Sequence, residues 1–137
     1  MQWLRKNAWV LLFGVGLVLL FYAYDNIVVI PSLAADDPTR GWVWLTRDPE
    51  VLDYIQWWFR TFGFWVLAVA IFVLITSATG YRQGQKWAYY SLLYLPVHII
   101  IHMIIWPWLI PALSVGLLIV IAGLVLPFRQ FFPPEPG

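Results

Sequence analysis

WAYYSLLYLPVHIIIHMIIW, residues 87–106, is the stretch of sequence that decides the fold. As a helix with a rise of about 1.5 Å per residue, it is long enough to cross the roughly 30 Å hydrocarbon core of a bilayer. It carries the only two histidines of the chain, His98 and His102. A separation of four positions is just over one helical turn, so both imidazoles lie on roughly one face. Pro96 frees the carbonyl of Leu92 and predicts a kink near the middle of the helix.

The composition is that of a membrane protein. The 137 residues are 62% hydrophobic, 19% aromatic and 11% charged, whereas a soluble domain has about 25% charged residues. A formal net charge of +1 gives no general attraction to nucleic acid. The chain has no cysteine, which excludes disulfides, thiolate metal sites, cysteine nucleophiles, covalent c-type haem and thiolate-ligated iron–sulfur clusters.

The apolar runs predict an all-α integral membrane four-helix bundle, because each has about the 20 residues needed to span a membrane. The expected spans are residues 8–30, 62–78, 87–106 and 109–126, all within a single membrane domain over residues 1–137. Residues 31–48 are expected to form an outer loop. Asp48 and Pro49 have the residue types of a helix start, so an amphipathic interfacial helix over residues 49–60 is expected to lead into the second span.

The distribution of basic residues predicts an orientation. One side of the predicted membrane holds five of the eight Lys and Arg residues: Arg5, Lys6, Arg82, Lys86 and Arg129. The other side holds the remaining three together with six of the seven acidic residues. Because Lys and Arg are enriched in cytoplasmic loops, we expect a multi-pass protein of the cell membrane with both termini in the cytoplasm.

Polar side chains from separate spans are predicted to share one layer in the outer half of the membrane. From the helical rise, Asp25 lies about 9 Å and His102 about 7 Å outward of the middle of their spans. An ionisable group at such depth costs about 2.5–3.5 kcal/mol on insertion scales and calls for a partner. We therefore expect a pocket open to the outer face, with an Asp25–His102 hydrogen bond or ion pair. The other members of this polar seam are Tyr22, Asn26, Arg60, Tyr94, His98 and Ser114.

Three interpretations of the polar seam stay open. His98 and His102 can ligate a haem, a chlorophyll-type pigment or a metal ion, although two histidines one turn apart cannot bind one haem iron from both sides. Asp25 and a histidine can form a proton relay. The sequence favours the third interpretation, in which the histidines make ordinary interhelical hydrogen bonds worth about 0.6 kcal/mol each and no cofactor is bound.

Tryptophan is concentrated at the outer ends of the predicted spans. An aromatic belt at the headgroup level explains such positions in general, but the number on this side exceeds what a belt requires. The surplus suits contact with lipid, with a quinone-like ligand or with a larger partner. The outer tryptophans are Trp42, Trp44, Trp57, Trp58, Trp106 and Trp108.

Several loop and span-end segments resemble small uncharacterised prokaryotic four-span membrane proteins. The similar segments are GYRQGQKW at residues 80–87, Tyr89-Tyr90, Leu95-Pro96 and LPFRQFF at residues 126–132. In architecture alone the chain is also similar to DoxX-like four-span proteins. The resemblance implies a four-helix membrane fold in a bacterium or archaeon, and it implies no catalytic residue.

No motif for a familiar reaction is present: the sequence lacks a GxSxG elbow, a P-loop and paired carboxylates within a span. We therefore expect a non-enzymatic small membrane protein, either an accessory or structural subunit of a larger membrane complex or a homo-oligomer. Lipids, other membrane subunits and a quinone-like ligand are its expected contacts. The alternative is a haem-, pigment- or metal-binding protein that uses His98 and His102. A membrane-embedded enzyme that acts through Asp25 and His102 on a lipid-like substrate ranks last.

Overall fold

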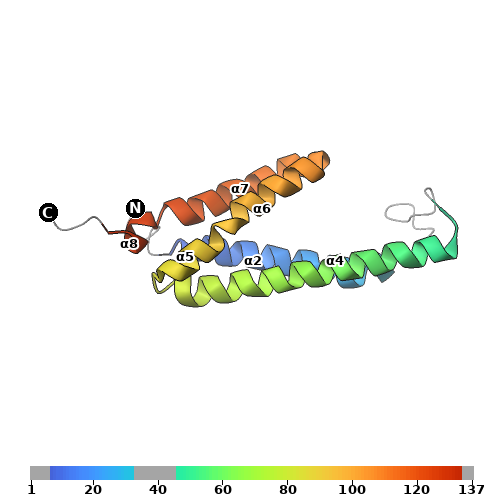
Figure 1. Ribbon diagram of the computed structural model, residues 1–137, viewed down its shortest axis with the longest axis horizontal. Helices are drawn as coiled ribbons and strands as arrows, with labels where there is room; N and C mark the ends of the chain where they lie inside the picture. The colour runs from blue at the N-terminus through green and yellow to red at the C-terminus, as the bar shows by residue number, and fades with distance from the viewer. Residues whose placement is uncertain (1–6, 33–45, 134–137) are drawn as a thin grey trace. The chain divides into compact units, whose positions relative to one another are not determined.

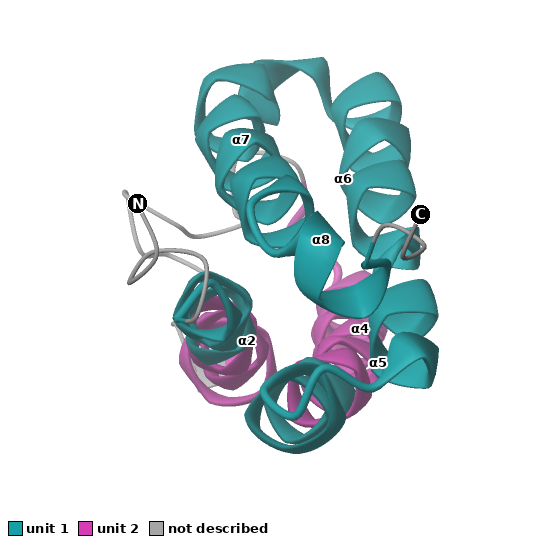
Figure 2. Ribbon diagram, turned by 90° about the vertical axis from the view of Figure 1, so that its left-hand side faces the viewer, with its two compact units in different colours: residues 1–17, 72–137 teal, residues 18–71 magenta. Residues whose placement is uncertain are grey.

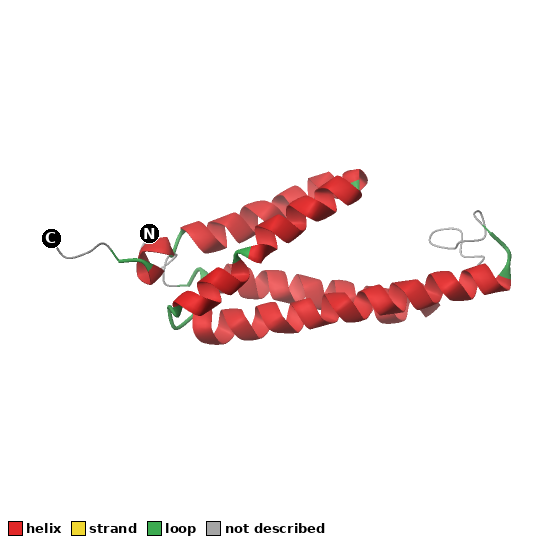
Figure 3. Cartoon of the chain, in the orientation of Figure 1, coloured by secondary structure: helices red, strands yellow, loops and turns green. Residues whose placement is uncertain are grey.

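The computed structural model describes residues 7–32 and 46–133, and within these ranges the chain is helical and contains no strand (Figures 1 and 3). Four helical runs in the described ranges are long and apolar enough to cross a membrane. They are Trp9–Val29, Pro49–Tyr81, Lys86–Ile105 and Pro107–Phe131. The expectation of an all-α protein with four helices of membrane length is therefore confirmed. Most of the predicted outer loop, residues 33–45, lies outside the described residues.

The first run changes its helical winding near its end. Helix α2 (Trp9–Tyr24) continues into a π-helical turn, η1 (Asp25–Val29), and then into the short helix α3 (Ile30–Ser32). In η1 the backbone N–H of Ile30 donates to the carbonyl of Asp25, five residues earlier. A π-turn of this kind is rare and often occurs at functional sites. Asn26, which lies in η1, is fully buried.

The second run is one uninterrupted helix. Helix α4 (Pro49–Thr76) continues into a second π-helical turn, η2 (Ser77–Tyr81). The helix begins as the sequence predicts, because the backbone N–H of Glu50 donates to Asp48 Oδ1 at 3.0 Å. The predicted interfacial helix and the second span are continuous, since neither proline nor glycine occurs in residues 50–62.

The third run is broken where the sequence predicts a kink. Helix α5 (Lys86–Leu92) ends and helix α6 (Tyr94–Ile105) begins on either side of Leu93. Leu93 N–H bonds the carbonyl of Tyr90, three residues earlier, at 3.2 Å. The break lies close to Leu92 because Pro96 has no N–H to donate to that carbonyl.

The fourth run folds back along the third. A 3₁₀ turn, η3 (Pro107–Leu109), leads into helix α7 (Ile110–Val125), and the short helix α8 (Phe128–Phe131) follows. Helices α6 and α7 lie side by side as an antiparallel hairpin (Figures 1 and 2). The connection between α6 and α7 is too short for the chain to reach any other helix, so α7 packs against α6.

The chain divides into two compact units (Figure 2). Unit 1 comprises residues 1–17 and 72–137, and unit 2 comprises residues 18–71. Helices α2 and α4 each contribute to both units. The prediction of a single membrane domain over residues 1–137 stays a prediction.

Small residues allow close helix packing in each unit. In unit 1 a Cβ atom added at Gly16 would lie 2.8 Å from Leu74 Cγ and 3.2 Å from the Leu74 backbone nitrogen. In unit 2 a Cβ atom at Gly63 would lie 3.1 Å from the backbone nitrogen of Ile27. Both distances are shorter than ordinary van der Waals contact, so only glycine lets the backbones approach to this distance.

Candidate functional site

One face of α6 and the residue that follows the helix carry a continuous row of rings, which we call the α6 ring row: Tyr94, His98, His102 and Trp106. Successive ring centroids are 5.9 Å, 4.2 Å and 4.8 Å apart. Residues four apart on a helix share a face, which is why the local sequence produces this row. All of these side chains are half-buried. The structure therefore brings together the sequence-predicted site residues Tyr94, His98 and His102.

The hydrogen bond of His102 determines which of its nitrogens is available. His102 Nδ1 lies 3.0 Å from the backbone carbonyl oxygen of His98. A carbonyl oxygen only accepts, so Nδ1 carries the proton and Nε2 of the neutral ring carries the lone pair. Metal-ligating histidines commonly donate their other N–H to a backbone carbonyl in this way. His102 Nε2 is thus able to accept a hydrogen bond or to ligate a metal.

Tyr94 places a second polar atom in the same row. Its hydroxyl oxygen is buried and has no hydrogen-bond partner in the part of the chain that the structure describes. The Tyr94 ring packs against Phe72, with centroids 6.2 Å apart. Within the described residues no group of three or more His, Asp or Glu side chains gathers for a metal ion. The described residues therefore do not by themselves supply a complete ligand set for a metal at His102.

Four other polar residues of the predicted outer layer lie in unit 2: Tyr22, Asp25, Asn26 and Arg60. Asn26 is fully buried, and its Nδ2 donates to the carbonyl of Tyr22 at 2.8 Å. Its Oδ1 has no hydrogen-bond partner among the described residues. Tyr22 also packs edge-on against Phe62 at 6.2 Å. Asp25 is half-buried in η1, and Arg60 is exposed on α4.

The predicted Asp25–His102 pair joins residues of different units and stays a prediction. Ser114, the remaining member of the predicted layer, is half-buried on α7 in unit 1. It lies four residues after the start of α7, and His102 lies three residues before the end of α6. At about 1.5 Å per residue the antiparallel hairpin brings them to a similar level.

The predicted outer tryptophans are divided among the parts of the chain. Trp57 and Trp58 of unit 2 line a shallow cavity of about 220 Å³ together with Thr61, Phe62 and Trp65. Trp106 and Trp108 lie at the α6–α7 turn of unit 1. Trp42 and Trp44 lie outside the described residues. A common outer tryptophan surface therefore stays a prediction.

Sequence reasoning missed an aromatic cluster where η2, α5 and α8 meet. We call it the end cluster: Tyr81, Tyr89, Tyr90, Phe128, Phe131 and Phe132. Tyr81 donates from its buried hydroxyl to the carbonyl of Gly123 at 2.6 Å. The ring of Phe131 lies 4.7 Å from that of Tyr81 and 5.0 Å from that of Tyr89. The segments GYRQGQKW, Tyr89-Tyr90 and LPFRQFF supply the whole cluster, so the signal was present as three aromatic-rich span ends.

Three basic residues belong to the helix ends that form or adjoin the end cluster: Arg82, Lys86 and Arg129. The guanidinium carbon of Arg82 lies 5.1 Å from the ring centroid of Trp9, and Lys86 Nζ lies 5.4 Å from that of Phe132. Both distances are within the range of cation–π attraction. Arg129, on α8, is exposed.

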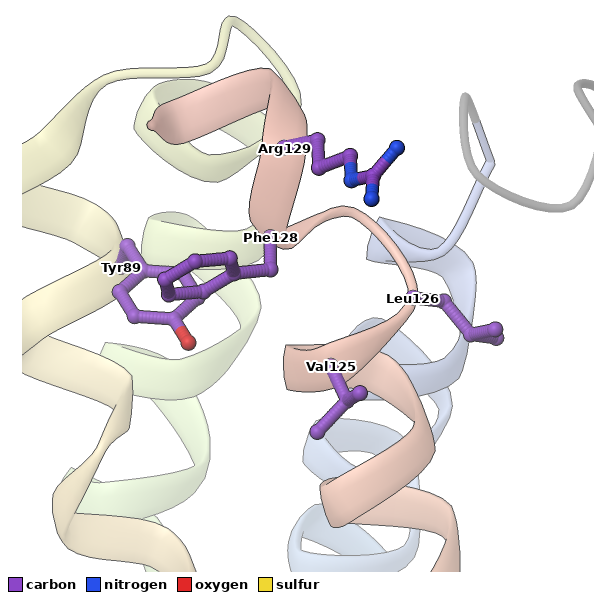
Figure 4. Close-up of a pocket in the computed structure, with 5 residues that line it drawn as sticks. All are labelled: Tyr89, Val125, Leu126, Phe128 and Arg129. Atoms are coloured by element: carbon purple, nitrogen blue, oxygen red, sulfur yellow. The ribbon is translucent and has the colours of Figure 1, made fainter. Parts of the chain in front are cut away.

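A cavity of about 430 Å³ lies beside the end cluster (Figure 4). Tyr89 and Phe128 form one side, with ring centroids 6.0 Å apart. Leu126 and Arg129 lie on the opposite side, and Val125 lies between the two sides (Figure 4). The Tyr89 hydroxyl is directed toward Val125 (Figure 4). The cavity thus combines an apolar surface with one cationic and one hydroxyl group.

No protein-family model matches the chain, and no curated protein or solved structure matches it significantly. The resemblance to small prokaryotic four-span proteins and to DoxX-like proteins stays a prediction. Only the geometry of this chain bears on its function.

Proposed function

We propose that this protein is a non-enzymatic integral membrane protein that packs through the α6 ring row against another membrane-spanning chain. That chain is a larger complex, in which this protein is an accessory subunit, or a second copy of itself. The observation that carries the proposal is the half-buried pair of imidazoles on the α6 ring row: His102 Nδ1 bonds the His98 carbonyl, which leaves Nε2 with a lone pair that a group on a facing helix can use. An unsatisfied polar group in hydrocarbon is costly, and a facing helix supplies its partner.

The exposure of the helices supports the proposal. Between 17% and 28% of the most hydropathic 18-residue stretch of each span is buried within the chain. Most of the span surface therefore faces lipid or another protein. Beside α6, helix α7 also presents a small residue, Gly116, where an added Cβ atom would meet nothing within 4 Å. Small residues on a free helix face allow a neighbouring helix to approach closely.

A cofactor role is the second candidate, and the hydrogen bond from His102 to the His98 carbonyl favours it. The bond orients the imidazole and leaves Nε2 as the ligating atom. A haem or chlorophyll-type pigment suits such a site better than a bare metal ion, because the macrocycle supplies the equatorial ligands. His98, whose ring centroid is 4.2 Å from that of His102, would then pack beside the bound ring.

A lipid or quinone-like ligand fits a different place, the shallow cavity in unit 2. Its lining is made mostly of aromatic rings from Trp57, Trp58, Phe62 and Trp65. Flat rings and acyl chains pack well against aromatic faces. We propose this contact as an addition to the packing role, not as a replacement for it.

The test is purification from native membranes in mild detergent, with the mass of the particle measured by light scattering. We expect wild-type protein to run as a multiple of 16.0 kDa or in a stoichiometric complex. The double variant His98→Leu/His102→Leu should weaken this association about tenfold, since interhelical polar contacts contribute about 0.6–2 kcal/mol each. Ile100→Leu, on the other side of α6, is the matched control and should change nothing.

Two outcomes would contradict the packing role. A wild-type monomer with no stoichiometric partner overturns it directly. A visible absorption band or bound metal that the double variant lacks, in a particle whose mass the variant leaves unchanged, assigns the histidines to a cofactor instead. A colourless, metal-free oligomer would exclude the cofactor role.

A further inference from the structure

Among the described residues, the end of unit 1 that holds the end cluster carries cations and no acidic side chain. Arg82, Lys86 and Arg129 belong to it. The described stretches of this unit, residues 7–17 and 72–133, contain no Asp or Glu. Within these stretches the positive charges therefore have no carboxylate to neutralise them. Such an end attracts anions.

The cations border one surface because the end cluster joins the helix ends that carry them. Tyr89 of α5 contacts Phe128, Phe131 and Phe132, with ring centroids 6.0, 5.0 and 5.4 Å away. Lys86 lies over the ring of Phe132. Arg129 is one residue after Phe128 and lines the cavity that Tyr89 and Phe128 also line. Arg129 thus lies at the cavity itself, and Lys86 lies against the end cluster beside it.

The length of the fourth apolar run leads us to expect the cavity at the depth of a lipid headgroup. It forms where α7 ends at Val125 and α8 begins at Phe128, near the end of the membrane-length run Pro107–Phe131. A helix that crosses the hydrocarbon ends at the headgroup level. A ligand at that level that has an anionic head and an apolar chain suits this lining. The polar side chains of Arg129 and Tyr89 match its head, and Val125 and Leu126 match its chain. Basic pockets between helices at this level bind anionic lipid headgroups in other membrane proteins.

We propose that this cavity binds the headgroup of an anionic glycerophospholipid. Its phosphate accepts hydrogen bonds from the Arg129 guanidinium, the Tyr89 hydroxyl on the opposite side donates to an ester carbonyl of the glycerol, and the first carbons of an acyl chain contact Val125 and Leu126. Arg82 and Lys86 raise the local positive potential. None of these residues belongs to the α6 ring row. A failure of the lipid-binding proposal would therefore leave the proposed packing role unaffected, and the reverse also holds.

The experiment is a lipid titration of the full-length protein in detergent, followed by native mass spectrometry. The probes are dioleoyl phosphatidylglycerol, which is anionic, and dioleoyl phosphatidylcholine, which is zwitterionic. We expect phosphatidylglycerol to bind at least tenfold more tightly. Arg129→Gln should lower its affinity about fivefold, which corresponds to about 1 kcal/mol per cation near a membrane surface. Phosphatidylcholine binding should not change.

Two further variants separate a binding role from a structural one. Tyr89→Phe keeps the ring of the end cluster and removes the hydroxyl, so it should weaken phosphatidylglycerol binding about two- to threefold. Arg47→Gln, an exposed cation of unit 2, is the matched control and should have no effect. If Arg129→Gln fails to fold, Lys86→Gln replaces it, with a smaller expected loss of affinity for phosphatidylglycerol.

Three results would overturn the proposal. Equal binding of the two lipids would show that charge does not select the occupant. If Arg129→Gln and Arg47→Gln lowered the affinity for phosphatidylglycerol equally, the lipid would not bind specifically in the cavity beside Arg129. Binding of inorganic phosphate at the same site, with phosphatidylglycerol displaced by millimolar phosphate, would assign the cavity to a free anion instead of a lipid.

Discussion

Tyr81 joins segments that are far apart in the sequence. Its hydroxyl bonds the Gly123 carbonyl, 42 residues away, and its ring packs on Phe131. We expect Tyr81→Phe to lower the free energy of unfolding by about 1 kcal/mol, because polar contacts between membrane helices average about 0.6 and reach about 1.7 kcal/mol. Unfolding in mixed micelles of a mild and a denaturing detergent measures the change.

Tyr90→Phe is the control for this prediction. Tyr90 belongs to the same end cluster, but its side chain is 58% exposed, so losing its hydroxyl should leave stability unchanged. Equal effects of the two substitutions would show that the Tyr81 hydrogen bond makes no separate contribution.

At the residue scale, the sequence predicted which side chains share a face of one helix. It did not predict which side chains of different helices are in contact. His98 and His102 share a face because their spacing is four residues on one helix. An Asp25–His102 pair depends instead on how two helices are rotated about their axes, which no spacing within one helix determines. The Tyr81–Gly123 bond was missed for the same reason, and because aromatic side chains at span ends are expected in any membrane protein.

At the element scale, hydropathy located the helices better than it located their ends. The fourth span was expected over residues 109–126, whereas the helical run is Pro107–Phe131. Its last turns are aromatic and basic, and they extend past the hydrocarbon that hydropathy detects. The break between α5 and α6 was predictable from Pro96. The π-helical turns η1 and η2 were not, because no residue pattern in the sequence marks them.

The close approach of α2 and α4 within unit 1 gives a prediction about one helix contact. Gly16→Ala should destabilise the protein by about 1–3 kcal/mol, the usual cost of overpacking. The added methyl would meet Leu74 Cγ at 2.8 Å and the Leu74 backbone nitrogen at 3.2 Å, and backbone cannot move aside as a side chain can. Detergent-induced unfolding followed by circular dichroism measures the loss.

Gly14→Ala is the matched control, two residues earlier on the same helix. A Cβ atom there would meet nothing within 4 Å. Since alanine is the better helix former by up to about 1 kcal/mol, we expect this variant to be as stable as wild type or more stable. A loss equal to that of Gly16→Ala would mean that both substitutions act through the helix itself and not through the contact with Leu74.

At the scale of the whole molecule, the charges are segregated along the chain. All described acidic residues belong to unit 2, namely Asp25, Asp48, Glu50 and Asp53, whereas the described part of unit 1 carries cations alone. The segregation is what a membrane orientation requires, because Lys and Arg are retained on the cytoplasmic side. We propose that the basic turn between η2 and α5 faces the cytoplasm and that the start of α4 faces outward.

The absence of cysteine allows this orientation to be tested with single-cysteine variants and a membrane-impermeant maleimide. We expect Thr46→Cys to react in intact cells and Gln83→Cys to react only after permeabilisation, since the helical run Pro49–Tyr81 separates the two positions by one crossing. Reaction of both from outside would mean that this run lies along the membrane and does not cross it. The reversed pattern would show that the bias of five basic residues to three does not determine the orientation. It would also place the cavity beside Arg129 in the outer leaflet, where the anionic lipids of the cytoplasmic leaflet do not reach it.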